Sequence, residues 1–125
     1  MAVTVSSISS PSSSTIITNT DVDETVDENM VPGSGTIQMV EIDNTANASD
    51  TIYVKLFNLT TSVTFGTTAP NMILPVKAAA KTTYSFPIGI AFGTGISIGA
   101  SKTAGSAGGA GTGPDSAITV RLLLA

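Results

Sequence analysis

At 125 residues with a net charge of −4, the chain has the size of one domain, and its five basic residues are too few for a nucleic-acid surface. It contains no His and no Cys, which excludes disulfides, thiolate metal sites and the commonest general base of enzymes. Charged residues make up 11% of the chain and Ser and Thr supply 34 positions. This balance favours packing against other subunits, although secreted or adhesive β-domains share it.

The first 35 residues have the composition of an extended arm. A Ser-rich stretch occupies residues 6–14, and the breaker VPGSG ends the segment at 31–35. Such a segment has too little apolar mass to fold alone, so it either stays disordered or adds hydrogen bonds to the open sheet edge of a neighbour. Ile16 and Ile17 can form a short strand within it. We therefore expect an N-terminal arm at 1–35, with these two residues as candidate partner contacts.

Acidic residues are concentrated in the same arm, where five of the nine lie within positions 21–28. Asp21, Asp23 and Glu24 are candidates for salt-sensitive contacts with basic groups of a partner. The run begins like the calcium loop of an EF-hand, but the Gly and Glu that such a loop requires further on are missing. No metal ligand is therefore predicted.

Residues 36–125 predict an all-β domain, a β-sandwich or jelly-roll-like fold, with six to eight strands and no helix. In the first strand, the apolar positions change parity between Met39 and Val40, which indicates a β-bulge. In the segment at 71–76, Pro75 predicts an edge strand or the end of a strand. The expected strands are 36–43, 51–58, a weak one at 61–65, 71–76, 82–86 ending at Pro87, 88–98 and 116–125, with a polar turn at 44–50 and a mobile Gly/Ala-rich loop at 99–114.

The strand at 51–58 is apolar on both faces. Burial on both sides fits a central strand that is covered by a second sheet or by another subunit. Tyr53 and Phe57 share a face with Lys55. We therefore take these two aromatic side chains as candidate interface residues that act by packing.

Two residue pairs are candidates for catalysis, and neither predicts an enzyme. Glu41 and Asp43 share a strand face about 7 Å apart, which glycosidases can use, but the chain has no Trp to stack on a sugar. Ser101 and Lys102 lie in a Gly/Ala-rich loop that would not lower the pKa of the lysine. We expect no catalytic residue, no metal site and no cofactor.

Three motifs occur in an unusual order. Residues 52–58 read IYVKLFN, residues 66–76 read GTTAPNMILPV, and residues 86–98 read FPIGIAFGTGISI. In this order they resemble a group of small phage virion proteins, including those of cyanophages, with the pattern YxKLYN… GTxxPxxxxPVPA… FPxGIxFxTGLxI. The resemblance covers residues 51–100, and the group often has Tyr where this chain has Phe57. It implies a β-sandwich component of the virion, of the capsid decoration or cement type, which forms trimers.

We therefore expect a non-enzymatic structural protein that binds and stabilises the major capsid protein shell of a bacteriophage. Its partners would be the major capsid protein and further copies of itself, as a homotrimer, with no nucleic acid and no membrane. The chain lacks the pattern of a signal peptide and any apolar run of membrane-spanning length. Synthesis in the host cytoplasm and a final position on the capsid surface of the virion are therefore expected.

Two other classes of function stay open. The chain could be a tail, fibre or head–tail connector component of the particle. It could also be a carbohydrate- or receptor-binding β-module, which would present an exposed aromatic platform or a metal site.

Overall fold

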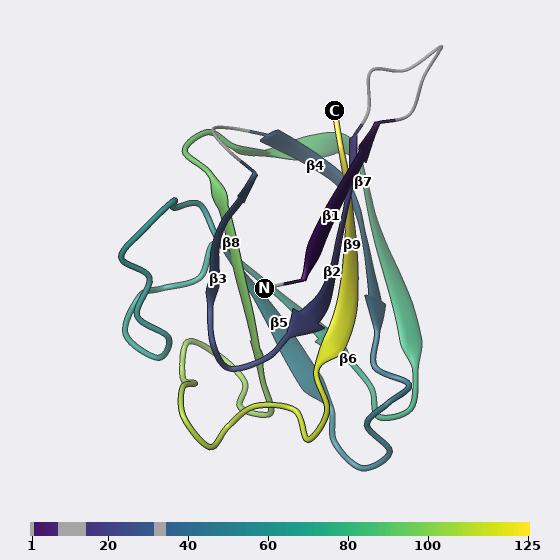
Figure 1. Cartoon of the computed structure of the whole chain (residues 1–125), viewed down its shortest axis with the longest axis vertical. Coiled ribbons are helices and arrows are strands. Elements are labelled where there is room, and N and C mark those ends of the chain that lie inside the picture. Colours follow the sequence, from purple (N-terminus) through teal and green to yellow (C-terminus); the bar gives the residue numbers. More distant parts are fainter. Residues whose placement is uncertain (1, 8–14, 32–34) are drawn as a thin grey trace.

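Two antiparallel sheets pack against each other in the computed structural model, which describes residues 2–7, 15–31 and 35–125 (Figure 1). Sheet A has the strand order β1-β2-β9-β4-β7, and sheet B has the order β3-β8-β5-β6. No helix occurs in the described residues, so the prediction of an all-β sandwich is confirmed. The strands are β1 Val3–Ser7, β2 Thr15–Val22, β3 Asp27–Val31, β4 Gly35–Asp43, β5 Ile52–Phe57, β6 Met72–Val76, β7 Lys81–Phe92, β8 Ile96–Ser101 and β9 Ile118–Leu124.

The core lies between the two sheets and follows from the alternation of side chains along each strand. In β9, Ile118, Val120, Leu122 and Leu124 are at most 4% exposed, whereas Arg121 points the other way and is exposed. Burying each such aliphatic side chain contributes roughly 1.5–3 kcal/mol. The inward-facing partners on the other strands are also mostly aliphatic: Ile17, Val22, Met30, Ile37, Val40, Ile42, Ile52, Val54, Leu56, Leu74, Val76, Ile96, Ile98 and Ala100.

The predicted bulge in β4 is present. Ile37 pairs with Leu124 and Met39 with Leu123, so β4 advances two residues where β9 advances one. Gln38 is the extra residue, and its insertion lets Ile37 and Val40 both face the core. The prediction for β6 is also confirmed, because this strand contains Pro75 and forms an edge of sheet B.

Strand β7 does not end at Pro87, contrary to the prediction. It continues to Phe92, and residues 86–89 loop out opposite Gln38, since Ser85 pairs with Met39 and Ile90 with Ile37. An edge strand tolerates the missing N–H of proline in such a loop-out. Three other predicted boundaries differ: 61–65 is not a strand, 88–98 divides between β7 and β8, and residues 99–101 belong to β8 rather than to a loop.

The described part of the N-terminal segment supplies three strands of the sandwich. β1 pairs with β2, β2 pairs with β9 in sheet A, and β3 pairs with β8 in sheet B. Ile17, Val22 and Met30 join the core from these strands. The predicted arm at 1–35 also includes residues 1, 8–14 and 32–34, which lie outside the described residues, so its behaviour as a unit stays a prediction.

Candidate interaction surface

The central part of the outer face of sheet A is formed by the side chains that alternate with the core residues of β2, β9, β4 and β7, and β1 adds Thr4 and Ser6 at its margin. Cross-strand pairing aligns these side chains in rows. The first row is Ile16, Leu123, Met39 and Ser85, and the second is Thr18, Arg121, Glu41 and Thr83. We call these eight residues the A face.

The first row of the A face is apolar over three adjacent strands. Ile16 of β2 pairs with Leu123 of β9, which pairs with Met39 of β4. All three side chains are partly buried, in contrast to the fully buried core residues that alternate with them. The A face therefore presents a continuous apolar strip at its centre.

The second row places a cation beside an anion. Arg121 donates a hydrogen bond from one guanidinium nitrogen to Glu41 Oε1 at 2.7 Å, and both side chains stay partly in solvent. One step further along, Asp43 pairs with Lys81 across β4 and β7, with 3.7 Å between the ammonium and the carboxylate. Exposed pairs of this kind contribute little to stability, which leaves their charges available to a partner.

The outer face of sheet B, by contrast, is covered by two loops of the same chain. Lys55 and Phe57 of β5 and Ser97 and Ser101 of β8 point outward from this sheet, yet none is more than 1% exposed. Figure 1 shows the two long loops, at 58–71 and 102–117, on the β8 side of the molecule. The both-face burial predicted for β5 is therefore produced by a second sheet on one side and by the chain's own loops on the other.

Lys55 fastens one of these loops to the sheet. Its ammonium donates hydrogen bonds to the carbonyl oxygens of Thr103, at 2.9 Å, and Ala107, and it lies 5.2 Å from the centroid of the Phe65 ring. The side chain is fully buried, and this desolvation lowers the pKa of Lys55 below its ordinary value. The lysine thus replaces water as the partner of two loop carbonyls.

Phe65 is the contact between the two loops. Its ring lies edge-on to Phe57, with 6.2 Å between the ring centroids. Gly99 of β8 and Gly108 of the second loop approach the ring so closely that neither position has room for a Cβ atom. These two glycines are therefore required for packing, which the composition of the loop does not reveal.

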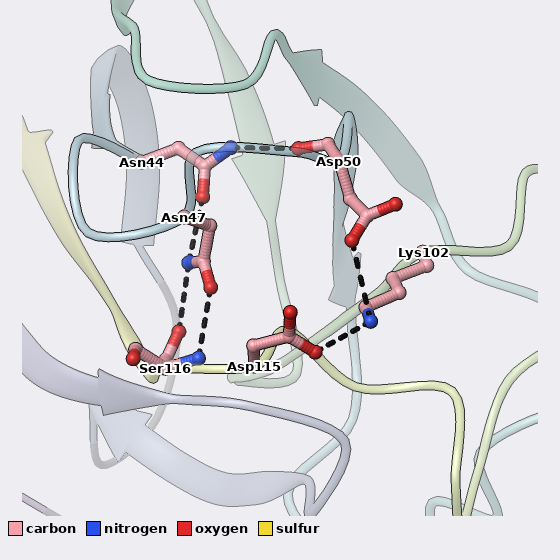
Figure 2. Close-up of polar contacts among 6 residues, drawn as sticks. All are labelled: Asn44, Asn47, Asp50, Lys102, Asp115 and Ser116. Carbon is pink, nitrogen blue, oxygen red and sulfur yellow. Dashed lines mark hydrogen bonds and ion pairs between the residues drawn. The ribbon is translucent and has the colours of Figure 1, made fainter.

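A buried amide cluster closes one end of the sandwich (Figure 2). Asn44 donates from Nδ2 to the carbonyl oxygens of Asp50 at 3.1 Å and Lys77 at 3.0 Å. Asn47 donates to Ser116 O at 2.8 Å and accepts from Ser116 N at 2.8 Å. The cluster joins three connections between strands, and in it Asn44 is fully buried and Asn47 is 4% exposed.

An ion-pair bridge lies beside this cluster in Figure 2. Lys102 Nζ is 2.6 Å from a carboxylate oxygen of Asp115 and 3.3 Å from one of Asp50. Hydrogen bonding to Asp115 first, and to Asp50 second, raises the pKa of Lys102. Ser101 donates its hydroxyl to Thr103 O, so Ser101 and Lys102 have separate partners and do not form a nucleophile–base pair.

The sequence-predicted partner residues fall in different places. Ile16 lies on the A face, but Ile17 and Phe57 are 1% exposed and pack inside this chain, which differs from the surface role expected for them. Tyr53 is half-buried, opposite Pro75 and Ser101. The sequence alone does not identify the other A-face residues as one surface, because their assembly depends on the register of strands far apart in the chain.

The acidic run has several internal partners. Asp27 accepts a hydrogen bond from Asn19 Nδ2 at 2.7 Å, and Glu28 accepts one from the backbone N–H of Val63 at 2.9 Å. Of the three predicted docking residues, Asp23 accepts from the N–H of Thr25, Glu24 packs against Gly113, and Asp21 is exposed. The run therefore helps to fasten both loops to β3 and its neighbours.

A groove with a volume of about 370 Å³ separates the edge strands β6 and β7. Tyr84 spans it by donating its hydroxyl hydrogen to the carbonyl oxygen of Pro75. Thr51, Lys77, Ala80 and Thr82 complete the lining. With its hydroxyl engaged and its ring half-buried, Tyr84 does not form an exposed aromatic platform.

No family model matches the chain, and no curated protein and no solved structure matches it either. Within the described residues, no group of three or more acidic side chains is placed to hold a metal ion. That part of the chain also lacks a helix long and apolar enough to cross a membrane.

Proposed function

We propose that the chain is a non-enzymatic structural subunit of a bacteriophage particle, of the decoration or cement type, which binds the shell of the major capsid protein. The proposal starts from the resemblance of residues 51–100 to small phage virion proteins. Acting on the capsid surface, such a subunit bridges neighbouring shell proteins and raises the barrier to opening of the shell.

The observation that carries the proposal is that loops of the chain cover the outer face of sheet B but not that of sheet A. On sheet B, the chain uses two loops, a buried lysine and two glycines to cover the outer face. On sheet A, an apolar strip with ion pairs along one side is only partly buried by the described chain. A partly exposed apolar strip beside charged residues is typical of protein–protein contact surfaces.

The arrangement of polar groups also favours a structural role over catalysis. The candidate carboxylates Glu41 and Asp43 are engaged with Arg121 and Lys81, respectively. No buried side-chain nitrogen or oxygen in the described residues lacks a hydrogen-bond partner. A site poised for chemistry commonly keeps such groups unpaired or strongly shifted in pKa.

The test is to mix the purified chain with phage particles assembled without it, and to measure co-sedimentation and the temperature at which the particles open. Saturable binding at a fixed ratio to the capsid protein, with a higher opening temperature, is the expected result. The variant Leu123→Ser, which interrupts the apolar strip, should bind more weakly, and Ile88→Ser is the matched control because Ile88 lies outside the A face. Binding to tails alone, or to glycans in an array, would overturn the decoration role.

A further inference from the structure

We infer that the A face packs against the A face of a second copy of this chain, in a dimer with a two-fold axis parallel to the strands. The inference uses the same surface as the proposed function, and it says what covers that surface when no shell protein is present. It concerns the isolated chain and can be tested without any phage particle.

The charge pattern carries this assignment. β9 and β4 are neighbours, and Arg121 of β9 pairs directly with Glu41 of β4. A two-fold axis placed between these strands lays β9 of one copy over β4 of the other. Arg121 of each copy then faces Glu41 of its partner, so the row is complementary to itself and both ion pairs become shared between the copies.

The apolar row obeys the same symmetry. Leu123 of one copy comes over Met39 of the other, and Ile16 comes over Ser85 at the margin. The second-row hydroxyls of Thr18 and Thr83 face each other across the interface. In both rows, the central side chains of one copy therefore face side chains of matching character in the other, and Ser or Thr lies at the margin. This is the arrangement expected for two sheets packed face to face.

A third match lies at the other end of the face. A third row contains Lys81 of β7, Asp43 of β4 and Thr119 of β9. Beside Thr119, strand β2 has a bulge between Asn19 and Val22. The axis brings Lys81 of one copy over this bulged part of the other, where Asp21 is exposed. The opposite charges of Lys81 and Asp21 favour the same arrangement.

The area of the face is small for a protein–protein interface. Four strands spaced about 4.8 Å apart and about seven residues long cover roughly 450 Å² per copy, or roughly 900 Å² for the pair. This lies at the low end of specific interfaces, where weak and transient contacts are found.

The β7 edge of sheet A is less suited to self-association. β7 is interrupted by Pro87 and by the loop-out of residues 86–89, and both features prevent a further strand from pairing there. Ile88, 97% exposed, lies in this loop-out. Contact through the A face needs no free backbone edge.

The experiment measures the mass of the full chain by sedimentation velocity at concentrations between roughly 1 and 300 µM, a range that reaches the weak association expected of a small interface. The wild-type chain should shift from monomer to dimer. Arg121→Glu and Glu41→Arg, each alone, should weaken association at least about tenfold, because like charges then face each other. An equimolar mixture of these two variants should form a heterodimer, because opposite charges then face each other again. Ile88→Ser should associate like the wild type.

The double variant Arg121→Glu with Glu41→Arg keeps the internal ion pair and guards against loss of folding. It should dimerise with itself but fail to exchange with wild-type chains, since that combination places like charges together. A wild-type chain that stays monomeric, forms the trimer implied by the resemblance, or mixes freely with the double variant would overturn the inference. If the dimer forms and capsid binding fails, only the decoration role is lost; if capsid binding occurs without a dimer, only this inference is lost.

Discussion

The outer faces of the two sheets contain similar kinds of residues and have opposite surroundings. On sheet B, the cation Lys55 is buried under a loop and bonded to two carbonyl oxygens. On sheet A, the cation Arg121 remains in solvent beside a carboxylate. The same kind of outward position therefore stabilises the fold on one face and stays available for a partner on the other, depending on whether the chain covers it.

The largest expected effect comes from removing the aromatic contact between the sheet B loops. Phe65→Ala should lower the free energy of unfolding by about 3 kcal/mol, because Phe57, Gly99 and Gly108 all lose a packing partner. Urea denaturation would measure this loss. On the A face, Met39→Ala should cost less, about 1 kcal/mol, since Met39 is smaller than Phe65 and lies on the partly exposed outer side of its strand. Equal losses at the two positions would contradict the difference between the faces.

A smaller effect is expected from exchanging the two cations for neutral side chains of similar length. Lys55→Met leaves Ala107 O without its donor and Thr103 O with only the Ser101 hydroxyl, so it should lower the unfolding free energy by about 2 kcal/mol. Arg121→Gln removes only an exposed ion pair, with an expected loss below about 1 kcal/mol. Differential scanning calorimetry would compare the two. A Lys55→Met protein as stable as the wild type would show that desolvation of the ammonium cancels its hydrogen bonds.

The smallest expected effect is a difference in pH dependence between two aspartates. Burial raises the pKa of Asp27 in sheet B, and its hydrogen bond from Asn19 only partly opposes this. Between the unfolded and folded pKa values, the folded state holds a proton that the unfolded state has lost. The contribution of Asp27 to stability is therefore full below about pH 4 and fades as pH rises through the folded pKa. Asp27→Asn should remove that decline in stability with rising pH.

Asp43 at the margin of the A face should behave in the opposite way. Hydrogen bonds from the hydroxyl and N–H of Thr45 lower the pKa of Asp43, with help from Lys81. Its contribution is therefore present above about pH 4 and lost as pH falls through the folded pKa. Thr45→Val removes the hydroxyl donor, so the stability of this variant should fall less as the pH is lowered. Unfolding curves between pH 2 and pH 7 would test both aspartates, and a common sign for the two would contradict the assignment of their causes.

Several features of the fold follow from the sequence alone. Alternation predicts the inward and outward sides of β9 because a strand places successive side chains on opposite faces. The change of parity beside Met39 locates the bulge, and Pro75 predicts the edge strand. Each of these signals is local, so a few neighbouring residues are enough to carry it.

Only the tertiary structure decides which residues form the outer face of each sheet and which face is covered. Ile16 and Leu123 are more than a hundred positions apart, yet the register of β2 against β9 makes them neighbours, and no local pattern records that register. The cover of sheet B depends in the same way on where Phe65 and the loop carbonyls arrive in space. By itself the sequence determined most strands of residues 36–125 and which sides of them are apolar. Long-range pairing, whose partners are fixed by packing of the whole core, decided which of those sides the chain covers and which it leaves open.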